Sequence, residues 1–187
     1  MQTYFALLRG INVSGQKMMK MSDLLDLFKG LHFKNARTYV QSGNVVFQAE
    51  NQNIASLQEQ IATAITEKFQ FSVPVLVKNQ TEWSWILQNN PFVNERNEDS
   101  TKLHVTLLAG EPNAAIIAKI DPAQYVPDEF RIVGNIIYLY CPNGYGRTKL
   151  HNNFFESKFK LAATTRNWKT VQELNHLAEA IAAAGEK

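Results

Sequence analysis

The chain has 187 residues, of which 45% are hydrophobic and 19% charged, and this composition predicts a globular protein of one or two domains rather than a disordered chain. Its longest uninterrupted apolar run covers only residues 136–141, which excludes a transmembrane helix. A single cysteine excludes an internal disulfide framework, and the first residues lack the basic stretch and cleavage site of a secretory leader. We therefore expect a cytoplasmic protein without a membrane partner.

The formal net charge of +2 does not by itself indicate a nucleic-acid-binding protein. Its distribution is more informative, because residues 1–50 carry an excess of three positive charges and residues 142–170 an excess of five. The stretch between them is acidic, with ten Asp or Glu against six Lys or Arg. A fold that brought the two basic segments together would attract anions, whereas a scatter of solvated lysines would not.

The first half of the chain predicts a complete βαββαβ unit. Apolar periodicity and turn residues indicate, in order, a strand over 3–8, a helix capped by Ser22 and continuing to 31, strands over 36–41 and 45–48, a helix over 54–69 and a strand over 71–77. Gly43-Asn44 between the two central strands favours a tight hairpin, since both residue types tolerate positive φ. This order is that of the split βαβ, or ferredoxin-like, arrangement.

The second half repeats most of this order. It predicts a short helix capped by Thr81, a strand over 102–108, a helix beginning at Pro112, strands over 129–133 and 136–141 around a second Gly-Asn turn, a helix capped by Thr148 and a last helix capped by Thr165. The polar stretch 90–100 indicates a boundary between two subdomains. We therefore expect an α+β protein with two ferredoxin-like subdomains, 1–90 and 101–187, the second with extra C-terminal helices.

Three motifs resemble a known family. They read Ala-Leu-Leu-Arg-Gly-Ile-Asn-Val over 6–13, Thr-Tyr-Val-Gln-Ser-Gly-Asn-Val-Val-Phe over 38–47 and Thr-Thr-Arg-Asn-Trp-Lys-Thr-Val over 164–171. In this order they are similar to the bacterial family called domain of unknown function 1697. The resemblance implies a small soluble α+β protein with ferredoxin-like elements. It implies no agreed activity and therefore no catalytic residues.

The first two motifs are predicted to meet. In a βαββαβ unit the first and second strands run in the same direction, so the loop after the first strand and the hairpin after the second lie at one end of the sheet. This places Arg9, Asn12 and Lys17 near Ser42 and Asn44, a set of donors suited to a phosphate or carboxylate. In the alternative interpretation, Asn44 satisfies the turn, Asn12 ties the loop to backbone groups and Arg9 pairs with Asp23 or Asp26 on the first helix.

Two further stretches are candidate anion sites. A helix starting at Thr165 would expose unpaired amides beside Arg166 and Asn167, which is favourable for an anion, although an ordinary helix cap uses the same residues. The glycine-rich loop 144–149 carries Arg147 and Lys149 and would allow a ligand to approach the backbone. Its alternative interpretation is a flexible connection.

Signals for specific chemistry are weak. The stretch 10–17 is similar to a phosphate-binding loop, but Gln16 separates the glycine from the lysine. The four histidines lack metal-ligand spacing, and Cys141 lies in an apolar run typical of a buried, inert thiol. We therefore predict neither a metal site nor a cofactor.

The leading hypothesis is a module that binds a small anionic, phosphorylated ligand, such as a nucleotide, or the phosphates of a nucleic acid. Its predicted site comprises Arg9, Asn12, Lys17, Ser42, Asn44, Arg147, Lys149, Arg166 and Asn167. An enzyme acting on a phosphorylated or amide substrate and a purely structural or interaction protein are the alternatives. The sequence does not determine the oligomeric state.

Overall fold

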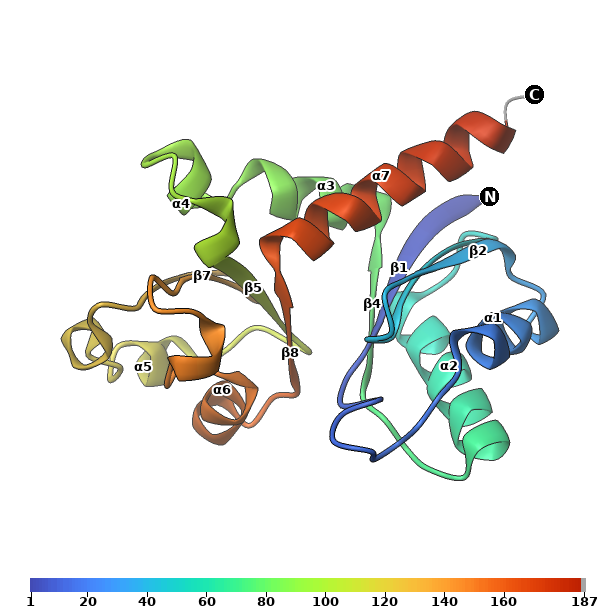
Figure 1. The fold of residues 1–187 in the computed structure, drawn as a ribbon, viewed down its shortest axis with the longest axis horizontal. Helices are drawn as coiled ribbons and strands as arrows, with labels where there is room; N and C mark the ends of the chain where they lie inside the picture. Colours follow the sequence, from blue (N-terminus) through green and yellow to red (C-terminus); the bar gives the residue numbers. More distant parts are fainter. Residues whose placement is uncertain (186–187) are drawn as a thin grey trace. The chain divides into compact units, whose positions relative to one another are not determined.

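In the computed structural model, which describes residues 1–185, the chain forms two compact units (Figure 1). The first unit comprises Met1–Trp85 and the segment from Gln172 onward, and the second comprises Ile86–Val171. The chain therefore passes from the first unit to the second at 85/86 and returns within the last helix. No helix in the part of the chain that the structure describes is long and apolar enough to span a membrane.

The first unit is built on a four-stranded antiparallel sheet. Its elements are β1 (Gln2–Leu8), α1 (Met21–Gly30), β2 (Lys34–Tyr39), β3 (Asn44–Ala49), α2 (Ile54–Phe69), β4 (Val75–Asn79) and α3 (Gln80–Gln88), the last of which continues into the second unit. The strand order is β2-β3-β1-β4, and each strand is antiparallel to its neighbours. Strands β1 and β2 therefore run in the same direction, as predicted for a split βαβ unit.

The core of this unit lies between the sheet and helices α1 and α2, which pack side by side (Figure 1). Alternate strand residues point into it, including Tyr4 and Leu8 of β1 and Phe47 of β3. The helices contribute residues at helical spacing, Leu24, Leu27 and Phe28 from α1 and Leu57, Ile61 and Ile65 from α2. On the opposite face of the sheet, the ring of Phe5 stacks on Trp83 of α3 at 4.4 Å between centroids.

The second unit repeats this architecture. Its elements are α4 (Pro91–Asn94), η1 (Ser100–Lys102), β5 (Leu103–Leu108), α5 (Ala114–Ile117), η2 (Pro122–Tyr125), β6 (Glu129–Val133), β7 (Ile136–Tyr140), η3 (Tyr145–Arg147), α6 (Asn152–Phe159), β8 (Ala163–Asn167) and the start of α7 (Trp168–Gly185). The sheet order β6-β7-β5-β8 matches that of the first sheet position by position. Its core lies on the side of α6, where Ile137, Leu139, Phe155 and Phe159 meet.

The prediction that a helix begins within residues 164–167 is wrong, because these residues belong to strand β8 and the helix begins only at Trp168. Strand β8 pairs along the free edge of β5, from Leu108↔Ala163 to His104↔Asn167. This pairing provides hydrogen-bond partners for the backbone groups at that edge of β5. A helix that began at Thr165 would leave those groups without partners in the sheet. The second unit therefore contains a complete βαββαβ order instead of the predicted β-α-β-β-α-α.

Other predicted helix starts are also wrong, because a different residue has the capping geometry at each. Helix α1 begins after Lys20 without a side-chain cap. Helix α3 follows Asn79, and the side chains of Asn79 and Glu82 each accept from the other's backbone amide. Helix α5 is capped by Asn113 rather than started by Pro112, and α6 is capped by His151 rather than by Thr148. Asparagine is as favourable at a helix start as the predicted Ser and Thr residues, and the His151 side chain accepts from the Phe154 amide.

Candidate functional site

The loop after β1 and the hairpin between β2 and β3 lie together at one end of the first sheet. The amide of Leu8 donates to the carbonyl of Gly43 at 2.8 Å, and Asn12 Nδ2 donates to the carbonyl of Gln41 at 3.0 Å. The predicted meeting of the first two motifs is therefore confirmed. It follows from the common direction of β1 and β2.

The polar groups of this junction hold the backbone together. Besides its bond to Gln41, Asn12 Nδ2 donates to the carbonyl of Met19 at 2.9 Å, and Asn12 Oδ1 accepts from the amide of Met19 at 2.7 Å. Lys17 Nζ donates to the carbonyl of Ser72 at 2.7 Å. The bonds of Asn12 are the backbone ties that the alternative interpretation predicted, whereas that of Lys17 was not predicted. Binding of a ligand by Arg9, Asn12 and Lys17 stays a prediction.

The hairpin is similarly closed by its own side chains. Asn44 is fully buried, and its Nδ2 donates to the Tyr39 carbonyl at 3.1 Å and to Ser42 Oγ at 2.7 Å. Gly43 has φ +72°, and a Cβ at this position would lie 2.6 Å from Cβ of Leu8. The hairpin and the loop therefore pack too closely for any residue larger than glycine.

In the second unit, Arg166 and Asn167 lie at the end of β8. Asn167 Oδ1 accepts from the Thr170 amide at 2.8 Å and so caps α7, the role that the sequence analysis assigned to Thr165. The half-buried Arg166 donates from a guanidinium nitrogen to the Thr165 carbonyl at 2.9 Å. Burial lowers the pKa of Arg166 to about 10, and nearby Tyr145 opposes this effect, so Arg166 is cationic at neutral pH.

The glycine-rich loop after β7 has a defined conformation. The Gly144 amide donates to the Cys141 carbonyl at 3.0 Å, and Gly144 itself has φ +89° and ψ +146°, a region open essentially to glycine alone. The next residue, Tyr145, stacks on His104 of β5 with 4.7 Å between ring centroids. Burial lowers the pKa of His104, opposed by the backbone of Lys102, so the loop rests on a neutral imidazole.

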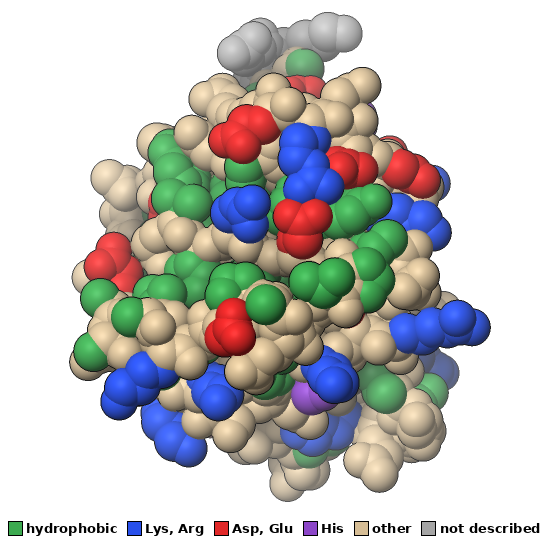
Figure 2. Space-filling view, turned by 90° about the vertical axis from the view of Figure 1, so that its left-hand side faces the viewer, with side chains coloured by type: hydrophobic (Ala, Val, Ile, Leu, Met, Phe, Trp, Pro, Cys, Tyr) green, Lys and Arg blue, Asp and Glu red, His purple; other side chains and the backbone are tan. Residues whose placement is uncertain are grey.

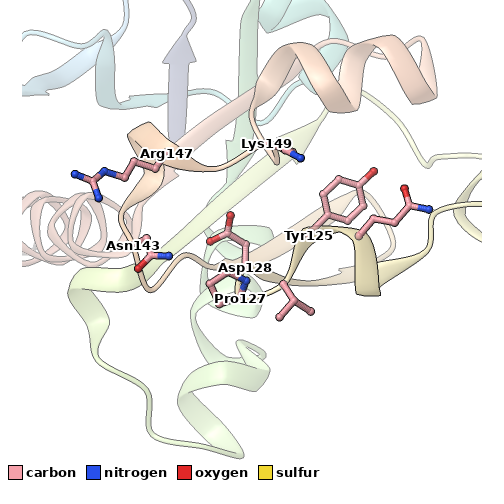
Figure 3. Close-up of a pocket in the computed structure, with 8 residues that line it drawn as sticks. Tyr125, Pro127, Asp128, Asn143, Arg147 and Lys149 are labelled. Atoms are coloured by element: carbon pink, nitrogen blue, oxygen red, sulfur yellow. The ribbon is translucent and has the colours of Figure 1, made fainter.

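This loop forms one wall of a pocket of about 320 Å³ (Figure 3). The pocket is lined by Gln124, Tyr125, Val126, Pro127, Asp128, Asn143, Arg147 and Lys149. Arg147 and Lys149 are exposed, and within residues 1–185 neither side chain makes an ion pair. The structure thus places two of the predicted cations in one pocket. The single pocket predicted to combine residues of both units stays a prediction.

The opposite wall was missed by the sequence analysis. It is a turn in which the Asp128 amide donates to the Tyr125 carbonyl at 2.8 Å, with a cis peptide bond between Val126 and Pro127. Figure 3 shows the Asp128 carboxylate directed toward the side of the pocket on which Lys149 lies, between Arg147 and the Tyr125 ring. The only local signal was the Pro-Asp dipeptide, which marks a turn but not a ligand site.

Cys141, which directly follows β7, is fully buried. Burial and the nearby Asp128 carboxylate raise the pKa of its thiol to about 11, although a hydrogen bond with Thr148 acts in the other direction. The thiolate form is therefore scarce at neutral pH, which argues against Cys141 as a nucleophile. Among the described residues, no group of three His, Cys, Asp or Glu side chains is placed to hold a metal ion.

The face of the molecule shown in Figure 2 combines basic and apolar side chains. Figure 2 shows the face that carries α4 and α5, with hydrophobic side chains across its middle and Lys and Arg side chains gathered toward its lower edge. Val126, which lines the pocket, is 74% exposed. A ligand in the pocket would therefore meet the apolar side chain of Val126 as well as Arg147 and Lys149.

Comparison with known proteins agrees with the fold described above. A family model described as protein of unknown function (DUF1697) matches residues 1–138. The chain belongs to this family. Its fold is also similar to that of the conserved bacterial protein SP0830 from Streptococcus pneumoniae, with a TM-score of 0.72 and 20% sequence identity over 94% of this chain and 98% of the other. No curated protein matches the chain.

Proposed function

We propose that the protein binds a small phosphorylated ligand in the pocket between the glycine-rich loop and the turn at Pro127. The observation that supports this most directly is that Arg147 and Lys149 line one pocket and are exposed without an ion pair in the described part of the chain. A guanidinium group can donate two parallel hydrogen bonds to a phosphate, and an ammonium group adds a mobile point charge.

The size and rigidity of the pocket favour a small molecule. Its volume of about 320 Å³ lies near the lower end of the roughly 300–1,000 Å³ typical of small-molecule sites. The loop that carries Arg147 is held by the Gly144 turn and by the stack of Tyr145 on His104. Because these contacts within the protein order the loop, binding would cost little further ordering of it.

The contrast with the first unit also supports this choice of site. There, Asn12, Lys17 and Asn44 direct their polar atoms to backbone carbonyls. Each of these side chains would have to give up such a bond before it could contact a ligand. Within residues 1–185, Arg147 and Lys149 have no comparable side-chain bond to exchange. We therefore assign the ligand to the second unit.

The test is calorimetric titration of the full chain with inorganic phosphate, propyl phosphate and ribose 5-phosphate at low salt. We expect binding of at least one of them, weakened about ten-fold by Arg147→Ala or Lys149→Ala, since hydrogen bonds to charged groups contribute roughly 1.5–3 kcal/mol. The matched control is Lys119→Ala, which removes an exposed lysine of the same unit that lies outside the pocket.

Two results would contradict the proposal. The first is that no phosphate compound binds, or that Lys119→Ala weakens binding as much as Lys149→Ala does. The second is that a single-stranded RNA oligonucleotide binds more tightly than every monoester, with an affinity that falls steeply as salt is raised. That outcome would favour nucleic-acid phosphates over a small ligand.

A further inference from the structure

We infer that the ligand is a phosphorylated sugar or other polyol whose hydroxyl groups are recognised by Asp128; this inference rests on the proposed function of the same pocket. Asp128 lines the pocket together with Arg147 and Lys149, and its carboxylate points toward the side of the pocket on which Lys149 lies (Figure 3). Its side chain makes no ion pair within residues 1–185. The carboxylate is therefore available to a ligand.

A carboxylate in this position has opposite effects on two kinds of ligand. It repels a bare anion, because like charges in a partly dehydrated site disfavour each other. It stabilises a ligand that brings hydroxyl donors beside its phosphate, because a hydrogen bond to an ionised acceptor is among the stronger ones. The pocket thus distinguishes a phosphate with attached hydroxyl groups from phosphate alone.

Asp128 is held in this position by the turn that precedes it. Its amide donates to the Tyr125 carbonyl at 2.8 Å, and the Tyr125 ring makes edge contacts with Phe154 at 5.2 Å and Phe130 at 6.2 Å between centroids. The Tyr125 ring therefore has a fixed orientation in the wall of the pocket. A carboxylate on such a support can select among ligands by hydrogen-bond geometry.

The remaining lining suits the carbon skeleton of a sugar. Tyr125, Val126 and Pro127 provide apolar surface on the side of the turn, and the amides of Asn143 and Gln124 provide further donors and acceptors. A sugar ring presents both C–H and O–H groups and so matches this mixture. Inorganic phosphate would leave the apolar wall and the carboxylate without partners.

The experiment compares ribose 5-phosphate with propyl phosphate, which has the same charged group but no hydroxyl groups. We expect the full chain to bind ribose 5-phosphate about ten-fold more tightly, as one hydrogen bond to a charged group predicts. In Asp128→Asn, propyl phosphate should bind more tightly and ribose 5-phosphate less tightly, so the ratio should fall to about two or less. Glu111→Gln, which neutralises an exposed carboxylate elsewhere in the unit, should keep the wild-type ratio.

The outcomes separate this inference from the proposed function. Equal binding of both esters, unchanged in Asp128→Asn and in Asp128→Ala, would overturn the role of Asp128 and leave the phosphate site in place. Absence of binding by every monoester would overturn both. Tighter binding of phosphoethanolamine than of ribose 5-phosphate would show that Asp128 selects an ammonium group and would also overturn the inference. Circular dichroism melting curves confirm that each variant is folded.

Discussion

Replacement of Asn12 by alanine tests whether the first motif acts through its backbone contacts. Asn12 makes three hydrogen bonds, two to Met19 and one to Gln41, and has φ +54°. Alanine removes all three bonds and leaves the Met19 amide without its acceptor. It also places a residue in the left-handed region that asparagine tolerates better.

The expected loss can be worked from these contacts. Each intramolecular hydrogen bond contributes about 1 kcal/mol net, so three bonds contribute about 3 kcal/mol. The left-handed backbone adds up to about 1 kcal/mol for alanine, while the exposure of the bond to Gln41 reduces the sum by a similar amount. We therefore expect the free energy of unfolding of the first unit to fall by about 3 kcal/mol in Asn12→Ala.

Asn35 provides a matched control within the same unit. It also has positive φ, +52°, but among the described residues its exposed side chain makes only one hydrogen bond, from Nδ2 to Gln48 Oε1 at 2.7 Å. Asn35→Ala should therefore cost about 1 kcal/mol, and the difference between the two variants isolates the two additional bonds of Asn12.

The assay is urea denaturation followed by fluorescence and circular dichroism, combined with hydrogen exchange of the Met19 amide. Asn12→Ala should lower the denaturation midpoint and accelerate exchange at Met19, whereas Asn35→Ala should leave that exchange unchanged. Equal losses of stability in the two variants, or unchanged exchange at Met19 in Asn12→Ala, would refute the assignment of Asn12 to the backbone junction.

Two further predictions concern the second unit. Gly144→Ala should lower the free energy of unfolding by about 1–3 kcal/mol in thermal melts, because Gly144 has φ +89°. Gly146→Ala should be nearly neutral, because Gly146 does not have positive φ and an added Cβ would meet no neighbouring group within 4 Å. Burial lowers the pKa of His104 below its ordinary 6.5. As the pH falls, the imidazole is therefore protonated in the unfolded chain before it is protonated in the folded one. The free energy of unfolding should then decrease as the pH drops below about 6.5. His104→Gln should reduce this dependence in denaturation curves recorded from pH 5 to 8, and an unchanged slope would contradict the buried, neutral imidazole.

Much of the architecture could be predicted from local sequence. The alternating residues of β1 and β3 and the helical spacing in α1 and α2 each specify a buried face, and these faces pack together in one core. The order of elements then fixed the direction of β1 and β2. The proximity of Asn12 to the hairpin was predictable for this reason. Whether Asn12 would bind a ligand or form hydrogen bonds to the backbone was left open by the sequence.

Strand β8 shows where local sequence is insufficient. The Thr-Thr-Arg-Asn stretch is compatible with either a strand or a helix cap, and the decision depends on the free edge of β5, which lies about 60 residues earlier in the chain. The same is true of the helix caps. Several residues near each helix start can accept an amide proton, and packing of the helix selects one of them.

The candidate pocket required both kinds of information. The basic, glycine-rich stretch that supplies Arg147 and Lys149 is evident in the sequence as one local segment. Tyr125 and Asp128 come from a turn that precedes β6, and only the sheet, with β6 and β7 paired antiparallel, returns the chain so that the two segments face each other across one pocket. Charge and turn chemistry are local properties of a chain, whereas the distance between a carboxylate and an ammonium group depends on long-range strand pairing.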